Sequence, residues 1–186
     1  MKEAFRRELT KIRKNLSKNE VLENSSKIKE KLFTLEGFQQ GKTILFYVSY
    51  DNEVYTYDMI KESMALGKKV IVPVSDKKYR KLILSKLENW DDLKPGAYGI
   101  LEPVEYKIKE VSIEEIDLII VPGVGFDERG NRIGHGKGYY DDLLSKSKAP
   151  HIGLAFEFQI VKEIPVEEHD MPVDKIITEK RVIDCK

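Results

Sequence analysis

The residues best suited to chemistry lie in one stretch, VPGVGFDERGNRIGHGKGYYDD, at positions 121–142. It follows DLIIV at 117–121, an apolar segment that predicts a buried parallel strand. The alternating glycines Gly134, Gly136 and Gly138 would expose backbone amides, and a short helical pattern follows them. Exposed amides and the positive end of a helix both attract anions. The stretch therefore predicts a phosphate site between a strand and a helix.

Charged side chains in the same stretch fit a phosphate site. Arg132 and Lys137 would add positive charge, while Asp141 and Asp142 could hold a divalent cation that bridges phosphate oxygens. Two plainer interpretations stay open, because glycines also form ordinary tight turns and acidic residues in a first helical turn complement the helix dipole. The stretch is not a Walker loop, since Lys137 is followed by Gly138 rather than by serine or threonine.

Three further groups of residues are candidates for binding. Lys2 and Arg6 are four apart and share one face of an amino-terminal helix, although such charged faces are usually solvated. Glu53 follows the first predicted strand, where its carboxylate could accept two N–H donors from a heterocycle or belong to a helix cap. His169 and Asp170 lie in a loop near the end of the chain, as catalytic partners, metal ligands or a solvated turn.

The elements that must position these residues alternate between helices and strands. Apolar residues recur at helical spacing in the first 35 residues, and a capping box of Ser17 and Glu20 separates two helices there. Beyond residue 40 the sequence predicts strands at 43–49 and 69–74, a helix at 54–66, a strand in KLILSKL at 81–87, loops with a short antiparallel excursion at 90–106, strands at 117–121 and 151–156, a helix near 138–147, and a final hairpin of 175–178 and 181–184.

The order of these elements predicts the fold class. A strand, helix and strand in succession imply a right-handed crossover and a parallel sheet. We therefore expect a three-layer α/β/α sandwich with a mainly parallel sheet, formed by residues 1–186 as a single domain. Ligands should bind beyond the carboxyl ends of the strands.

Composition excludes several classes of protein. The 32 basic and 32 acidic side chains of the 186 residues cancel, so the overall charge favours binding to neither nucleic acid nor an anionic membrane. The basic first 18 residues lack the apolar core of a signal peptide, and no apolar run approaches the ~18 residues of a spanning helix. A single cysteine, Cys185, permits no internal disulfide. We expect a cytoplasmic monomer without nucleic-acid or membrane partners.

The segment PGVGFDERGNRIGHGKGYYD closely resembles the signature of the 5-formyltetrahydrofolate cyclo-ligase family, also called 5,10-methenyltetrahydrofolate synthetase. The resemblance extends to KEAFR, YVSYDNEVYT, KVIVPV and IPVEEHDMPVD, and so covers essentially the whole chain. It implies a magnesium-dependent enzyme of one-carbon metabolism that converts 5-formyltetrahydrofolate to 5,10-methenyltetrahydrofolate while ATP becomes ADP and phosphate. The family is thought to phosphorylate the formyl oxygen, after which folate nitrogen N10 attacks the activated carbon.

The resemblance also implies roles for individual residues. Asp141 and Asp170 match magnesium-binding carboxylates, Glu53 matches a carboxylate that holds the pterin ring, and Lys137 and Arg132 match catalytic cations. Residues expected along ATP are Lys2, Arg6, Arg132, Ile133, Gly134, His135, Gly136, Lys137, Gly138, Tyr139 and Tyr140, and those expected at the folate are Val48, Glu53, His135, Gly136, Lys137, Gly138 and Tyr139.

His135 departs from the family pattern, because many members have arginine at this position. An unperturbed histidine is largely neutral at pH 7, which puts its contact with phosphate in question but leaves it able to donate one hydrogen bond. Two other functions are compatible with the residues alone. A sugar-phosphate isomerase could use the glycine loop for a substrate phosphate, and a non-catalytic protein could bind folate or nucleotide without releasing ADP.

Overall fold

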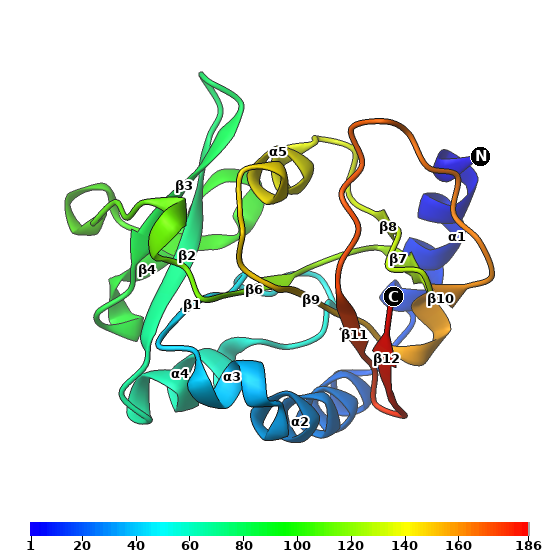
Figure 1. The fold of residues 1–186 in the computed structure, drawn as a ribbon, viewed down its shortest axis with the longest axis horizontal. Helices are drawn as coiled ribbons and strands as arrows, with labels where there is room; N and C mark the ends of the chain where they lie inside the picture. The colour runs from blue at the N-terminus through cyan, green and yellow to red at the C-terminus, as the bar shows by residue number, and fades with distance from the viewer. Residues whose placement is uncertain (186) are drawn as a thin grey trace.

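The computed structural model describes residues 1–185, and a seven-stranded sheet lies at its centre (Figure 1). The strands follow the order β12-β11-β9-β6-β1-β2-β3, and only the outermost pairs, β2 with β3 and β11 with β12, are antiparallel. Their bounds are β1 Thr43–Leu45, β2 Lys69–Asp76, β3 Lys81–Lys86, β6 Leu118–Val121, β9 His151–Leu154, β11 Lys175–Ile177 and β12 Val182–Asp184. The mainly parallel sheet predicted from the sequence is confirmed.

Helices cover both faces of this sheet. On one face lie α2 (Lys18–Thr34), α3 (Glu36–Gln40) and α4 (Tyr57–Ala65), and on the other lies α5 (Tyr139–Ser145), as Figure 1 shows. The strands alternate accordingly, since Ile44 packs toward α2–α4 and its neighbour Leu45 packs in the cluster that contains α5. This is the predicted three-layer arrangement. No helix within residues 1–185 combines the length and the apolar character that a bilayer crossing requires.

A smaller layer carries the amino-terminal helix. It is a three-stranded sheet of β10 (Ile160–Val161), β7 (Gly125–Asp127) and β8 (Arg132–Ile133), and α1 (Lys2–Lys14) packs against it. Leu9 of α1 packs closely over Gly125 of β7, because a Cβ atom at Gly125 would lie 2.7 Å from Leu9 Cδ1. This contact places α1, at the start of the chain, beside β7, in the middle of the chain.

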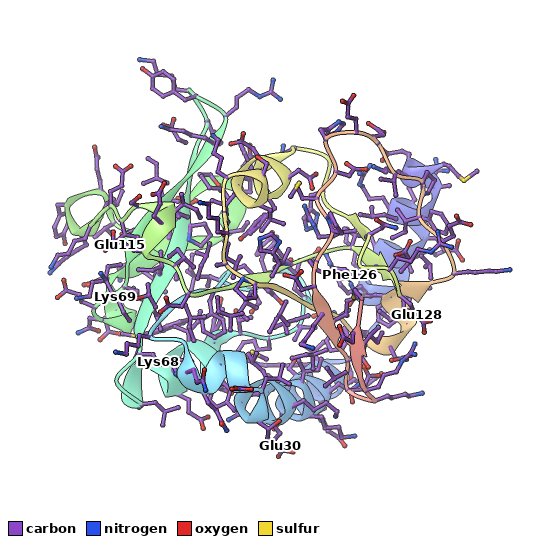
Figure 2. All side chains as sticks on the ribbon, viewed as in Figure 1. Glu30, Lys68, Lys69, Glu115, Phe126 and Glu128 are labelled. Carbon is purple, nitrogen blue, oxygen red and sulfur yellow. The ribbon has the colours of Figure 1, made fainter. Side chains whose placement is uncertain are left out.

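Phe126 of β7 anchors the small sheet to the large one (Figure 2). Its ring is fully buried and takes the space that side chains at Gly123 and Gly153 would need, since a Cβ atom at either would approach the ring to 2.6 Å. Gly123 in the glycine-rich stretch is therefore a packing residue, and the segment after β6 is held firmly against β9.

Several boundaries differ from the prediction. The first strand ends at Leu45 rather than at 49, because Tyr47 and Ser49 bond instead with the Thr56 side chain. The same hydrogen bonds of Thr56 make α4 begin at Tyr57 rather than at 54. The short helix α3 was not predicted as a separate element. The β9 strand ends at Leu154 rather than at 156.

The segment between β3 and β6 matches the predicted loops. It contains a two-stranded antiparallel hairpin of β4 (Leu93–Pro95) and β5 (Leu101–Pro103), which is the predicted excursion. The terminal hairpin of β11 and β12 is likewise confirmed. Single 3-10 turns occur at Trp90–Asp92, Glu105–Lys107, Ile113–Glu115 and Glu157–Gln159, and a kinked turn at Ala97–Gly99 contains Tyr98 with a φ of +60°.

Candidate active site

The glycine-rich loop lies after β8 and leads into α5. No backbone amide from Gly134 to Gly138 donates a hydrogen bond to any residue of the described chain. Gly136 and Gly138 have φ values of +92° and +74°, a conformation that L side chains rarely adopt, and Gly138 caps the start of α5. Five successive amides without a partner in the described chain, next to cationic side chains, are the kind of donor set that suits an anion with several oxygens.

Arg6 brings α1 to this loop. Its Nε donates a 2.8 Å hydrogen bond to the Gly134 carbonyl, and Nη1 pairs with Glu3 at 2.6 Å. The guanidinium also lies over Gly136, where a Cβ atom would be 3.7 Å from Arg6 Cζ. Arg6 therefore contacts the glycine loop and is not an isolated surface charge. The alternative that this side chain only faces solvent does not hold.

Lys2 reaches a different segment, the loop before β11. Its Nζ hydrogen-bonds Asp170 and lies 3.8 Å from Glu167. Burial of the Asp170 carboxyl opposes ionisation, but the hydrogen bonds from Lys2 and from the Glu167 amide outweigh it and lower the pKa of Asp170. His169 is more exposed, with Nε2 3.6 Å from Asp170 Oδ1. Asp170 is thus an ionised carboxylate held by α1.

Asp141 lies in the first turn of α5 but does more than complement the helix dipole. Its Oδ1 accepts the Met171 amide at 3.1 Å and Arg132 Nη2 at 3.4 Å. The hydrogen bond to Met171 places Asp141 next to the residue that follows Asp170. The structure therefore brings the two predicted metal carboxylates into adjoining segments, each with one oxygen already used by protein donors.

Arg132 is buried beneath the loop and does not extend into it. Its side chain is 6% exposed, Nη1 donates to the Pro122 carbonyl at 3.2 Å, and its carbon Cζ lies 5.8 Å from the centre of the Tyr140 ring. Burial lowers the pKa of Arg132, although Asp141 opposes the shift, and burial raises the pKa of Tyr140. The Nε atom of Arg132 is buried and has no hydrogen-bond partner in the described chain. Arg132 thus holds Asp141 and the loop from below.

Lys137 of the loop lies against an aromatic ring from another segment. Its Nζ lies 4.4 Å from the centre of the Tyr98 ring. Tyr98 is in the turn between β4 and β5, and a hydrogen bond with Tyr139, together with the nearby Lys137 ammonium, lowers the pKa of its hydroxyl. Sequence reasoning missed Tyr98, because it lies in a turn-rich segment without a periodic pattern.

Glu53 occupies the turn after β1. Its side chain is 11% exposed, Oε1 accepts the Tyr50 amide at 2.8 Å, and Oε2 lies 3.7 Å from His135 Nε2. The turn itself is strained, since Asp51 and Asn52 have φ values of +49° and +59°. Glu53 is not part of a helix cap, because α4 begins four residues later and its N-cap residue is Thr56.

The end of α1 holds this turn in place. Asn52 Nδ2 donates to the carbonyls of Arg13 and Leu16 at 3.0 and 3.1 Å. Arg13 is 3% exposed, and its Nε and Nη1 atoms find no partner within the described chain. Sequence reasoning gave Arg13 no role, because a lone arginine on a basic helix carries no signal that it is buried.

Two predicted contact residues have buried side chains. Val48 is 3% exposed in the main core, and Ile133 is 1% exposed and packs with Leu9. Only their backbone atoms could face a ligand. His135, by contrast, is half exposed and joins the glycine loop to Glu53. The predicted phosphate-binding and folate-binding residues therefore adjoin each other, with His135 between them.

A family model and two relatives with similar sequences indicate the same family. The model of the 5-formyltetrahydrofolate cyclo-ligase family matches residues 1–179. The 5-formyltetrahydrofolate cyclo-ligase of Mus musculus is 33% identical over 96% of this chain and 93% of its own, and that of Haemophilus influenzae is 32% identical over 95% and 96%.

Solved structures agree with this match. The 5,10-methenyltetrahydrofolate synthetase of Aquifex aeolicus superposes with a TM-score of 0.88 at 35% identity and covers 100% of this chain and 93% of that one. The corresponding Mycoplasma pneumoniae protein gives 0.78 at 26% identity, with coverage of 96% and 98%. The chain belongs to the 5-formyltetrahydrofolate cyclo-ligase family and is an enzyme of the ligase class.

Proposed function

We propose that this enzyme uses ATP to convert 5-formyltetrahydrofolate to 5,10-methenyltetrahydrofolate, with release of ADP and phosphate, in the single domain of residues 1–186. The observation that carries the proposal is the row of unsatisfied amides from Gly134 to Gly138, with Arg6 over it and Glu53 beyond His135. One side of this arrangement suits phosphate oxygens and the other suits the N–H donors of a pterin ring.

ATP is needed because an amide-like formyl oxygen is a poor leaving group. The formyl oxygen attacks the γ-phosphorus, and the bond from phosphorus to the β,γ-bridging oxygen breaks to release ADP. N10 then attacks the activated carbon and loses its proton, and the carbon–oxygen bond breaks to release phosphate. Phosphoryl transfer depends on positioning and on charge neutralisation, so no protein nucleophile is required.

The residues divide these tasks between the two substrates. The loop amides and Arg6 bind phosphate oxygens, and Lys137 turns from the Tyr98 ring toward the transferred phosphate as the catalytic cation. Arg132 acts from below by holding Asp141 in place. Glu53 orients the pterin ring, and His135 donates one hydrogen bond at the boundary between the substrates.

Asp141 and Asp170 fit a magnesium ion that also binds phosphate oxygens. Within residues 1–185 there is no cluster of three or more histidine, cysteine or acidic side chains able to hold a metal unaided. Mg²⁺ usually binds through one or two carboxylates, substrate phosphates and water, so two carboxylates suffice. The ion would neutralise phosphate charge when bound, and the protein's part is to hold both carboxylates in place, Asp170 through Lys2 and Asp141 through Arg132.

The test combines product and nucleotide measurements. Incubation with 5-formyltetrahydrofolate, ATP and Mg²⁺ should raise the near-ultraviolet absorbance of the methenyl product and release one ADP for each product formed. No rise at any pH between about 5 and 9, a range that spans histidine titration, would overturn the proposal. Binding of folate and ATP without ADP release would instead support the non-catalytic alternative.

A further inference from the structure

The first two turns of α1 lie on the nucleotide side of the proposed site. Lys2 hydrogen-bonds the Asp170 carboxylate, and Arg6 Nε donates to the Gly134 carbonyl at 2.8 Å. The Arg6 guanidinium also lies over Gly136, in the middle of the glycine loop. A phosphate bound at this loop is therefore bound by α1 as well.

The opposite end of α1 holds the turn that carries Glu53. Asn52 Nδ2 donates to the carbonyls of Arg13 and Leu16 at 3.0 and 3.1 Å. Asn52 has a φ of +59° and its neighbour Asp51 one of +49°, and residues other than glycine keep such a backbone only where surrounding contacts hold it. Glu53 is thus oriented by a turn that depends on its contact with α1.

The apolar packing of α1 is small. It forms a cluster separate from the two large cores of the sheet, and the buried members of this cluster are Leu9, Val124, Ile133 and Ile164. At the end of the helix Arg13 is buried, and its Nε and Nη1 atoms have no partner within the described chain, which opposes docking. A segment with few buried apolar contacts opens at a lower free-energy cost than the core. The polar contacts at both ends therefore contribute a large share of what holds α1 in place.

We propose that Asn52 couples the folate site to the nucleotide site through α1. A nucleotide bound at Arg6 and the glycine loop stabilises the docked helix, and the docked helix holds Asn52 and so orients Glu53 for the folate. The nucleotide then strengthens folate binding, and by linkage the folate strengthens nucleotide binding by the same factor. Asn52 is a positioning residue, since it acts through Glu53. The inference rests on the proposed function, because it takes ATP and the folate as the ligands of the two sides.

The test measures folate affinity with and without nucleotide. The β,γ-imido analogue of ATP with Mg²⁺ replaces ATP, so that no phosphoryl transfer occurs, and 5-formyltetrahydrofolate is titrated by fluorescence. The analogue should lower the wild-type Kd for the folate roughly tenfold. In Asn52→Gly, which keeps a residue suited to positive φ and removes only the amide side chain, this ratio should fall below about twofold. The Kd of the analogue alone should change less than about twofold, because its contacts are intact.

Asp51→Gly is the matched control. It makes the same kind of change at the neighbouring position of positive φ, where the side chain is exposed and an ionised carboxylate has no N–H to donate to α1. The roughly tenfold ratio should persist in this variant. A purely structural role of Asn52 would weaken folate binding equally with and without the analogue. That outcome, an unchanged ratio in Asn52→Gly, or a wild-type ratio near one would overturn the inference.

A second measurement needs no folate, and it separates this inference from the proposed function. The Tyr50 amide donates to Glu53 Oε1, so its hydrogen exchange, followed by NMR, reports on the turn. The analogue should slow this exchange about fivefold in the wild-type protein and leave it unchanged in Asn52→Gly. If no cyclisation is detected, so that the proposed function fails, this result still supports the coupling. Equal exchange with and without the analogue in the wild-type protein would overturn it.

Discussion

Replacing Glu53 by glutamine tests the folate-binding side of the active site. The Tyr50 amide, 2.8 Å from Oε1, should hold the amide oxygen of the new side chain. The NH₂ group then takes the place of Oε2 and faces the N–H donors of the pterin ring instead of accepting from them. Hydrogen bonds to a charged group contribute about 1.5–3 kcal/mol each, so the loss is about 3 kcal/mol and folate affinity should fall roughly 100-fold to 200-fold.

The assay for this prediction measures both ligands separately. Folate binding is titrated by fluorescence, and ATP binding with Mg²⁺ is titrated by calorimetry, where the change should stay within about twofold because the phosphate side is intact. Asp51→Asn is the matched control, since it makes the same chemical change at an exposed position in the same turn. Unchanged folate affinity in Glu53→Gln, or an equal loss for both ligands, would refute the reasoning.

The remaining predictions concern ATP, pH and packing. Arg6→Ala should weaken ATP binding by roughly 10-fold to 100-fold in calorimetry, because it removes a charge-assisted contact, while the exposed neighbour Arg7→Ala should leave it nearly unchanged. The lowered pKa of Asp170 stabilises the fold above the unfolded value of about 3.9, and this contribution is lost as pH falls through the lower folded value. Asp170→Asn should therefore cost about 1 kcal/mol in urea unfolding at pH 7 and less near pH 3, and an equal cost at both pH values would contradict the ion pair. Phe126→Ala should reduce the free energy of unfolding by about 3–5 kcal/mol through a cavity between the two sheets, and a loss below about 1 kcal/mol would show that Phe126 does not anchor them.

The sequence predicted the large sheet because its strands carry strong local signals. The segments at 69–74 and 117–121 are apolar and bounded by turn residues, and the structure places β2 and β6 there. It did not predict the small sheet of β10, β7 and β8, whose strands have two or three residues and so show no alternation. The first strand was predicted too long, because the continuation at 46–49 is as apolar as the strand itself.

The active site was predicted in a different way. The glycine pattern indicated an anion site from local chemistry, and the position of Glu53 after the first predicted strand indicated a contact for a heterocycle. The roles of Lys2 and Arg6 came from the family resemblance, because their partners lie far away in the chain. Burial could not be predicted from residue type, and Arg132 shows this, since it lies under the loop and holds Asp141. Cytoplasmic location and the monomeric state stay predictions.

In the proposed reaction, one site brings the γ-phosphate of ATP to the formyl oxygen of the folate. The most direct test uses 5-formyltetrahydrofolate labelled with ¹⁸O in the formyl group and measures the isotope in the released phosphate by mass spectrometry. We expect one labelled oxygen in phosphate for each methenyl product formed. Label released as water, with unlabelled phosphate, would contradict it.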